Sequence, residues 1–272
     1  MVLVGVDAQV AGDLQRALDD LLGRQFGVLL GAGIGAATAT QLAAAGVPRI
    51  MIVGRNSERG EATRAAVASG NSCEVTFLAA DATTVEGAAR IAAEAEKQLG
   101  GVDILVCTTA ADVQPELFAN IPTDDISRTF TQLALPSMYM ASEILPHMSR
   151  RKTGVIINVA SDAGKTATPG EAVIGAAKAA IVMFTRTLAI EAKRSGIRVN
   201  VLTPSLVNGT GSTERITSAG FSAKLFAKAA TQAHLGVPES EDIAALAVFL
   251  ASPAARRLTG QAISVNGGIS AA

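Results

Sequence analysis

The chain has 272 residues, of which 49% are hydrophobic and 17% charged, and its formal net charge is −1. This balance lacks the basic excess of nucleic-acid-binding proteins, and no apolar run approaches the ~20 residues that a membrane-spanning helix needs. Two cysteines (Cys73, Cys107) and two histidines (His147, His234) are too few for a disulfide framework or a histidine-based metal site, so we expect a cytoplasmic α/β protein that binds no nucleic acid, membrane or metal.

Residues 10–23 read VAGDLQRALDDLLG and place leucines and alanines on one face of a helix. The spacing predicts a helical appendage over residues 1–24 that packs on the domain or on another subunit. Residues 25–272 are expected to form a single domain, because α/β folds of about 250 residues are commonly one unit.

Residues 26–46 predict a buried strand, a glycine turn and a helix of small residues. Gly31, Gly33 and Ala36 match G-x-G-x-x-G/A, in which the first glycine makes a tight turn and the second lets a pyrophosphate approach the backbone. The N-terminus of the following helix offers N–H donors to phosphate. The residues expected at this phosphate site are Gly31, Gly33, Ile34 and Gly35.

Arg55 ends the next predicted strand, where a dinucleotide site places the residue that reads the ribose. No carboxylate stands there, and Asn56 follows. An arginine suits the 2′-phosphate of NADP, which a carboxylate would repel. The alternative is an arginine in a solvated loop.

Strands and helices then alternate to the end of the chain, which predicts a Rossmann-like, doubly wound parallel sheet of about seven strands with helices on both faces. A long helix is expected over residues 123–149, kinked by Pro136. A polar loop over residues 205–220 and a helix over 221–233 are expected to form a lid of mixed, moderately apolar character. A last strand is expected over residues 260–268.

Ligands of such sheets bind at the carboxyl ends of the strands. Several residues with binding or catalytic chemistry fall at this predicted edge, which supports a site better than any one motif does. They are Gly31, Arg55, Asp81 with the following Ala82, Thr108, Ser161 and Pro204.

Residues 156–181 carry the most informative pattern. An apolar strand ends at Ser161, a loop with glycine and proline follows, and a helix of small residues carries Lys178. The pattern predicts a polar site in which Ser161 and Lys178 face one cleft. Ile174 precedes Lys178 by one helical turn and shares its face.

The segments LPHMSRRKTGVIINVAS, AAKAAI, IRVNVLTP and FLASPAARRLTGQAISVNGG follow one another along the chain. Together they resemble the second half of the short-chain dehydrogenase/reductase family, and the resemblance extends over residues 26–268. It implies a single Rossmann-like domain, a nicotinamide cofactor, a small carbonyl or alcohol substrate, and a homotetramer or homodimer.

The resemblance places the family's catalytic serine at Ser161 and its catalytic lysine at Lys178, where that lysine binds the nicotinamide ribose. The family's tyrosine, its general acid/base, falls on Ile174, and its helix asparagine falls at or near Leu133. Isoleucine has no proton to exchange, so the resemblance implies an atypical site that lacks the catalytic tyrosine.

The cofactor motifs also depart from the family's pattern. T-G-x-x-x-G-x-G is replaced by the shorter LGAGIG of residues 30–35, N-N-A-G by CTTA of residues 107–110, and P-G by PS of residues 204–205. Asp81 matches the aspartate that approaches the adenine. NADP is the expected cofactor, with NAD as the alternative.

Few residues offer a substitute for the tyrosine. Tyr139, the one tyrosine of the chain, is expected to point away from the site, and the loop charges of Asp162, Lys165 and Glu171 are expected to stay solvated. Lys178 itself would become an acid if burial lowered its pKa, although holding the ribose hydroxyls is its simplest role.

Three functions therefore remain open from the sequence. The first is an NAD(P)-linked oxidoreductase of this family with a non-standard proton donor. The second is a catalytically inactive binding or partner subunit. The third is a non-redox enzyme that uses Ser161 with Asp162, Glu171 or Lys178 for acid/base work in the same cleft.

Overall fold

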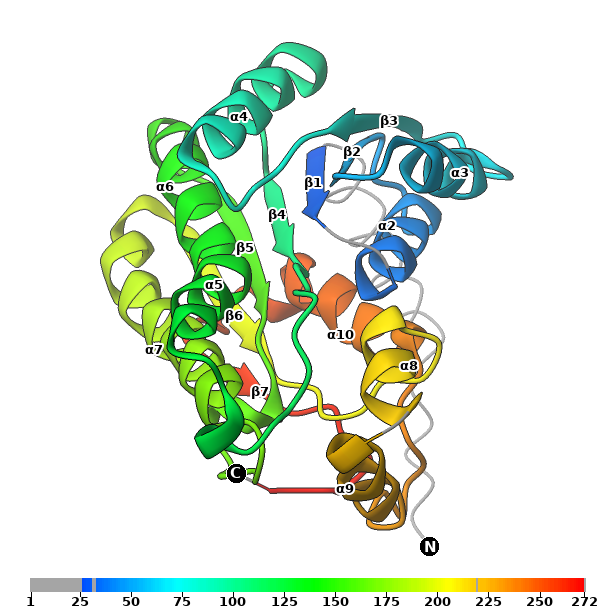
Figure 1. Cartoon of the computed structure of the whole chain (residues 1–272). Coiled ribbons are helices and arrows are strands. Elements are labelled where there is room, and N and C mark those ends of the chain that lie inside the picture. Colours follow the sequence, from blue (N-terminus) through cyan, green and yellow to red (C-terminus); the bar gives the residue numbers. More distant parts are fainter. Residues whose placement is uncertain (1–25, 31–32, 219, 272) are drawn as a thin grey trace, which may run out of the picture.

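The computed structural model describes residues 26–30, 33–218 and 220–271. The predicted helix over residues 10–23 and the predicted turn residue Gly31 lie outside these ranges. In the described ranges, seven parallel strands form one sheet in the order β3-β2-β1-β4-β5-β6-β7 (Figure 1). The predicted doubly wound parallel sheet is confirmed, and its strand order reverses between β1 and β4, the point where such sheets bind ligands.

The elements have the following bounds. The strands are β1 (Phe26–Leu30), β2 (Arg49–Gly54), β3 (Glu74–Ala79), β4 (Ile104–Cys107), β5 (Gly154–Val159), β6 (Ile197–Leu202) and β7 (Ala262–Ile263). The α-helices are α2 (Ile34–Ala44), α3 (Ser57–Ala68), α4 (Val85–Leu99), α5 (Thr123–Leu133), α6 (Leu135–Arg151), α7 (Ala172–Ala192), α8 (Gly211–Ser218), α9 (Gly220–Ala230) and α10 (Ser240–Ala251). The short 3₁₀ turns are η1 (Phe118–Asn120), η2 (Asp162–Gly164), η3 (Lys193–Ser195) and η4 (Pro253–Ala255).

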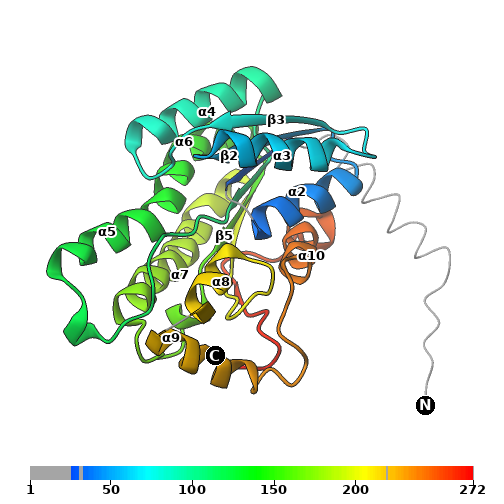
Figure 2. The same ribbon diagram turned by 45° about the vertical axis from the view of Figure 1, so that its right-hand side comes forward.

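Helices cover both faces of the sheet, so its central strands are mostly apolar and do not alternate with polar residues. All residues of β4 and β5 are buried, as expected for strands that are covered on both sides. Helices α4, α6 and α7 pack on one face, with Ile91, Met140 and Ile144 in that core layer. Helices α2 and α10 pack on the other face through Leu42 and Ile243 (Figure 2).

Helix α7 is long and apolar enough, by length and composition, to cross a membrane. In this fold it is a core helix: ten of its residues are buried, and it packs against β6 and the turn η2. Core helices and membrane-spanning helices share this apolar pattern, and in this fold the pattern belongs to a core helix.

The expected long helix over residues 123–149 is two helices, so its prediction as one kinked helix was wrong. The first, α5, ends at Leu133, and Pro136 is the second residue of α6. A proline in the first turn of a helix removes no hydrogen bond, because the N–H there has no partner within the helix. The proline therefore marks a new helix start rather than a kink.

Two further elements differ from expectation. The polar loop expected over residues 205–220 contains α8, whose first turn is capped by Thr210, since its hydroxyl accepts a hydrogen bond from the Thr213 N–H at 3.2 Å. The last strand, expected over residues 260–268, pairs with β6 only at Ala262–Ile263. It ends early because the chain turns at Asn266, whose side-chain oxygen accepts a hydrogen bond from the Gly268 N–H at 3.0 Å.

Helices α8 and α9 lie beyond the carboxyl ends of the strands (Figures 1 and 2), and the arrowheads of β4 and β5 point toward this end of the sheet (Figure 1). The same edge of the sheet receives η2, which follows β5, and the first turn of α7. Two glycines let these elements approach closely: a Cβ at Gly175 would lie 2.8 Å from the Ala163 carbonyl oxygen, and a Cβ at Gly164 would lie 2.9 Å from the Lys178 backbone carbon.

Substituting Gly175→Ala tests this approach. Alanine normally stabilises a helix interior relative to glycine by about 0.5–1 kcal/mol, but here the new methyl group must displace η2. We expect a net loss of about 1–3 kcal/mol in the free energy of unfolding, measured by chemical denaturation. Gly211→Ala on α8 is the matched control, because its Cβ would meet only Arg215 at an ordinary 3.6 Å; an equal loss in both variants would contradict the packing described.

Candidate functional site

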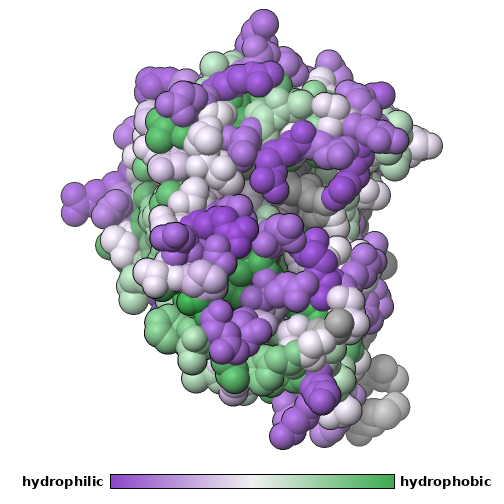
Figure 3. Space-filling model, in the orientation of Figure 1, coloured by the Kyte–Doolittle hydropathy of each residue, from purple (hydrophilic) through white to green (hydrophobic). Residues whose placement is uncertain are grey.

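Two adjoining cavities open at the carboxyl edge of the sheet, where hydrophilic residues surround a recess with hydrophobic residues visible inside it (Figure 3). The β2–β3 cavity has a volume of about 530 Å³ and lies at the ends of β2 and β3. The β5–α7 cavity has a volume of about 510 Å³ and lies between the end of β5, α7 and the lid helices α8 and α9. Residues 108–111 and Thr210 line both cavities, so one elongated ligand could occupy both.

Arg55 and Asp81 stand in the β2–β3 cavity, each delivered by the end of its strand. Asn56 also lines it and caps α3, because its side-chain oxygen accepts a hydrogen bond from the Arg59 N–H at 2.8 Å. This cap holds Arg55 and Arg59 at one wall of the cavity. Both arginine side chains are exposed, so both are available to an anionic ligand.

Gly33 lines the same cavity immediately before α2. Its φ is 58°, in the left-handed region that favours glycine. A Cβ there would also lie 3.2 Å from the Thr210 methyl group, at the start of the lid. Glycine is therefore suited to this position both by its backbone angle and by the close approach of the lid.

One buried polar atom in each cavity wall lacks a hydrogen-bond partner in the part of the chain that the structure describes. The Gln132 side-chain oxygen lies in the wall of the β2–β3 cavity, and the Thr166 hydroxyl lies in the wall of the β5–α7 cavity. Buried polar atoms are normally satisfied, so both walls fit a ligand that carries polar groups along its length. A dinucleotide meets this requirement.

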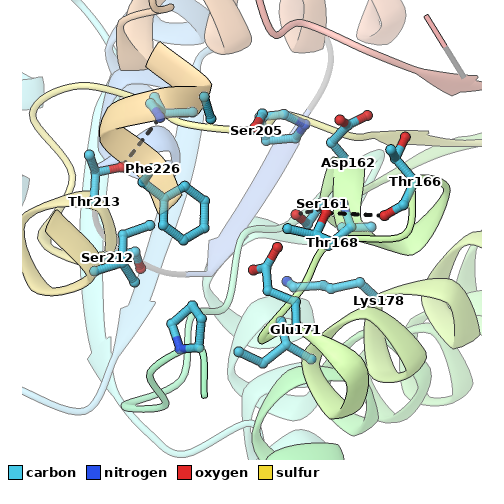
Figure 4. Close-up of a pocket in the computed structure, with 18 of the residues that line it drawn as sticks. Ser161, Asp162, Thr166, Thr168, Glu171, Lys178, Ser205, Ser212, Thr213 and Phe226 are labelled. Atoms are coloured by element: carbon cyan, nitrogen blue, oxygen red, sulfur yellow. Dashed lines mark hydrogen bonds between the residues drawn. The ribbon is translucent and has the colours of Figure 1, made fainter. Parts of the chain in front are cut away.

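Ser161 and Lys178 share the β5–α7 cavity, as the sequence predicts (Figure 4). Ser161 follows β5, and its hydroxyl accepts a hydrogen bond from the Ala163 N–H at 3.2 Å. Lys178 extends from α7 with only 8% of its surface exposed. Its ammonium group donates to the Val159 carbonyl at 3.5 Å, which is long for a hydrogen bond, so it retains donors for a ligand.

Burial shifts the pKa values of two charged groups in this cavity. Desolvation lowers the pKa of Lys178 to about 8, although the nearby Glu171 carboxylate opposes the shift. Desolvation also raises the pKa of Glu171 to about 7; Lys178 opposes this shift and Asp162 adds to it. Groups with pKa values near neutrality occur often at functional sites.

The expectation that Asp162, Lys165 and Glu171 stay solvated was wrong. Asp162 is 6% exposed and accepts a hydrogen bond from the Ser270 hydroxyl at 2.7 Å. The Lys165 ammonium donates to the Ser264 hydroxyl at 2.7 Å. The C-terminal segment therefore covers this loop, while Glu171 turns into the cavity.

The remaining predicted residues are placed as follows. Ile34 and Pro204 line the β5–α7 cavity with Thr108, and Ala82 lines the β2–β3 cavity, whereas Gly35 is buried within α2 and lines neither. Residues of the lid helices that the sequence did not single out, among them Arg215 and Leu225, also line the cavities. Threonine is a residue type that commonly caps helices, so Thr210 was the sequence signal that could have revealed α8 and its cavity-lining residues.

Ile174 and Leu133 present apolar side chains to the β5–α7 cavity. Tyr139 packs against the core between α6 and the sheet and lies outside both cavity linings. Cys107 is buried and its pKa is raised by burial to about 12, which makes its thiol a poor nucleophile. Among the described residues, no group of three or more His, Cys, Asp or Glu side chains is arranged to hold a metal.

Comparisons with known proteins agree with this fold. A family model described as enoyl-(acyl carrier protein) reductase matches residues 27–270. The chain is 30% identical over 246 residues to the 7alpha-hydroxysteroid dehydrogenase of Bacteroides fragilis, covering 87% of this chain and 90% of that protein.

Two solved structures superpose on the chain with TM-scores of 0.83. One is a short-chain type dehydrogenase/reductase from Mycobacterium ulcerans, 26% identical, with 90% of this chain and 89% of that chain covered. The other is YwfH, an NADPH dependent reductase involved in bacilysin biosynthesis, 27% identical, with 91% and 99% covered. The chain therefore belongs to the short-chain dehydrogenase/reductase family.

Proposed function

We propose that this protein is an NADP(H)-dependent oxidoreductase that interconverts a small carbonyl compound and its alcohol. The observation that carries the proposal is the pair of adjoining cavities, with Arg55 and Asp81 in one and Ser161 and Lys178 in the other. The activities named for the relatives from Bacteroides fragilis and for YwfH support it.

The residues of the β2–β3 cavity suit the adenosine half of the cofactor. Arg55 offers a cation to a 2′-phosphate, and Asp81 offers a hydrogen-bond acceptor beside the adenine. Gly33 lets the pyrophosphate approach the backbone closely, and the N-terminus of α2 offers it N–H donors. We propose that Gly31 also allows this close approach. Thr108 and Pro204 lie farther along, toward the second cavity.

The residues of the β5–α7 cavity suit the reacting half. The nicotinamide, when bound, supplies or accepts the hydrogen and electron pair of the redox reaction. Lys178 holds ribose hydroxyls through its unused donors, and the Ser161 hydroxyl donates to the substrate oxygen. The apolar side chains of Leu133, Ile174 and Phe226 favour a moderately apolar substrate.

Ile174 replaces the tyrosine that serves as general acid/base in this family, so we propose that the proton donor is non-standard. A positioned acid contributes roughly 10²–10⁴-fold in rate, equivalent to about 3–5 kcal/mol of barrier. A second candidate function follows from the same isoleucine: an inactive partner subunit kept for ligand binding. Turnover by the isolated chain distinguishes the two.

Arg55→Ala tests the cofactor assignment. We expect at least a roughly tenfold weaker affinity for NADPH, equivalent to about 1.4 kcal/mol, because the 2′-phosphate loses its cation. Affinity for NADH, which lacks that phosphate, is expected to change little. Arg64→Ala is the control, since Arg64 lies on α3, the helix that follows Arg55, and pairs with Glu61 at 2.6 Å. Calorimetric titration measures the affinities of the wild type and both variants for NADPH and NADH, and an equal loss for both nucleotides in Arg55→Ala would contradict the assignment.

Ile174→Tyr tests whether the site is built for hydride transfer. A phenol at this position would stand one turn from Lys178 on the same helix face. We expect reduction of small ketones such as cyclohexanone and ethyl acetoacetate, followed by NADPH absorbance, to rise at least roughly tenfold. If NADPH binds both proteins equally and the rate does not rise, the nicotinamide and substrate positions assumed here are wrong.

A further inference from the structure

Glu171 occupies an unusual position for an acidic residue at the start of a helix. It is the N-cap of α7, yet its side chain forms no capping hydrogen bond. The side chains that cap helices, aspartate among them, accept a hydrogen bond from the first turn. Here the carboxyl group instead points into the β5–α7 cavity, toward the space that Ser161 and Lys178 also face (Figure 4).

Glu171, Ile174 and Lys178 share one face of the helix start, at spacings of three and four residues. The cavity-facing stripe therefore carries a carboxyl group one turn before the isoleucine and an ammonium group one turn after it. The three residues from Glu171 to Ile174 rise about 4.5 Å along the helix axis, a distance that the extended glutamate side chain spans. Glu171 is partly buried, and its carboxyl group forms no hydrogen bond with the residues that the structure describes.

We propose that Glu171 is the general acid/base of this site, exchanging the proton of the substrate oxygen beside Ser161. This inference rests on the proposed oxidoreductase function and names the group that replaces the tyrosine. In it, Ser161 orients the substrate oxygen and Lys178 stabilises the carboxylate that forms.

The atoms balance as a carbonyl reduction. The C=O π bond breaks, a C–H bond forms with the hydrogen and electron pair that the reduced nicotinamide contributes, and an O–H bond forms with the proton of the Glu171 carboxyl. The carboxylate then takes a proton from solvent. The reverse sequence oxidises the alcohol, with the carboxylate as base.

The charged groups around Glu171 suit this role. Lys178 on α7 lowers the pKa of Glu171, and Asp162 on η2 raises it. Lys228 of α9 lines the same cavity. Glu116 lies on the neighbouring loop, but its carboxylate bonds the Leu117 N–H at 2.7 Å and Asn120 at 3.0 Å. Burial raises the pKa of Glu171 to about 7, close to the pH at which a general acid/base works best.

The sign of the pH dependence follows from that raised pKa. Below pH 7 Glu171 holds the proton that reduction needs, so kcat/KM for reduction is expected to fall as pH rises through about 7. Oxidation needs the carboxylate and is expected to rise over the same range. Lys178 loses its proton only at higher pH, near 8.

Glu171→Gln tests the proposal in the full-length protein. We expect kcat/KM for the ketone that the wild type reduces fastest to fall roughly 10²–10⁴-fold, the inflection near pH 7 to disappear, and NADPH affinity to stay within about threefold. Infrared titration without cofactor gives an independent readout: a protonated carboxyl band that titrates near pH 7 in the wild type should be missing in the variant. Glu191→Gln, at an exposed position of the same helix, is the control and should change neither readout.

The double variant Glu171→Gln/Ile174→Tyr guards against a folding defect. Recovery of ketone reduction by the new phenol would show that the glutamine variant retains its cofactor and substrate positions. Suppose that the wild type reduces ketones. If kcat/KM of Glu171→Gln then lies within twofold of the wild-type value, or if the carboxyl band is unchanged in the variant, the role of Glu171 is overturned while the proposed oxidoreductase function stands. Failure of the wild type to bind NADPH would overturn the proposed function, and this inference with it.

Discussion

The close contact between the turn η2 and helix α7 determines the geometry of the site. Ser161 enters the cavity from β5, whereas Lys178 enters it from a helix that begins eleven residues later in the chain. Gly164 and Gly175 remove the two side-chain methylenes that would hold these elements apart. A serine hydroxyl and a buried lysine thereby share one cavity, and the desolvation that follows sets the pKa values of both Lys178 and Glu171.

Burial determines the acid/base properties of Lys178 and Glu171. In water an ammonium and a carboxyl group are both charged at neutral pH, because their ordinary pKa values lie far above and far below 7. The ammonium is then a weak acid and the carboxylate a weak base. In the β5–α7 cavity their pKa values move toward each other, to about 8 and about 7. The apolar Ile174 contributes to this environment rather than only lacking a phenol, because it lines the wall between the two charged side chains.

The fold was predictable from the sequence because its signals are local and periodic. Apolar strands such as β5 and the small-residue helix α7 are recognisable from a few consecutive residues. Of the residues expected at the strand ends, those that the structure describes line the two cavities: Arg55, Asp81, Thr108, Ser161 and Pro204. Pairings between distant segments were not predictable in this way. Nothing local indicates that Ser270 covers Asp162 across 108 positions, so a loop acid that appeared solvated is buried. Glu171 was misjudged for the same reason, since it turns into a cavity that segments distant in the chain also line.

A crystal structure of the protein determined with NADPH is the most direct test of this site. We predict that the dinucleotide spans both cavities, with its 2′-phosphate at Arg55 and its nicotinamide ribose at Lys178, and that the Glu171 carboxyl faces the open space beside Ser161. A structure in which saturating NADPH leaves these cavities empty, or in which the ribose lies away from Lys178, would contradict this prediction.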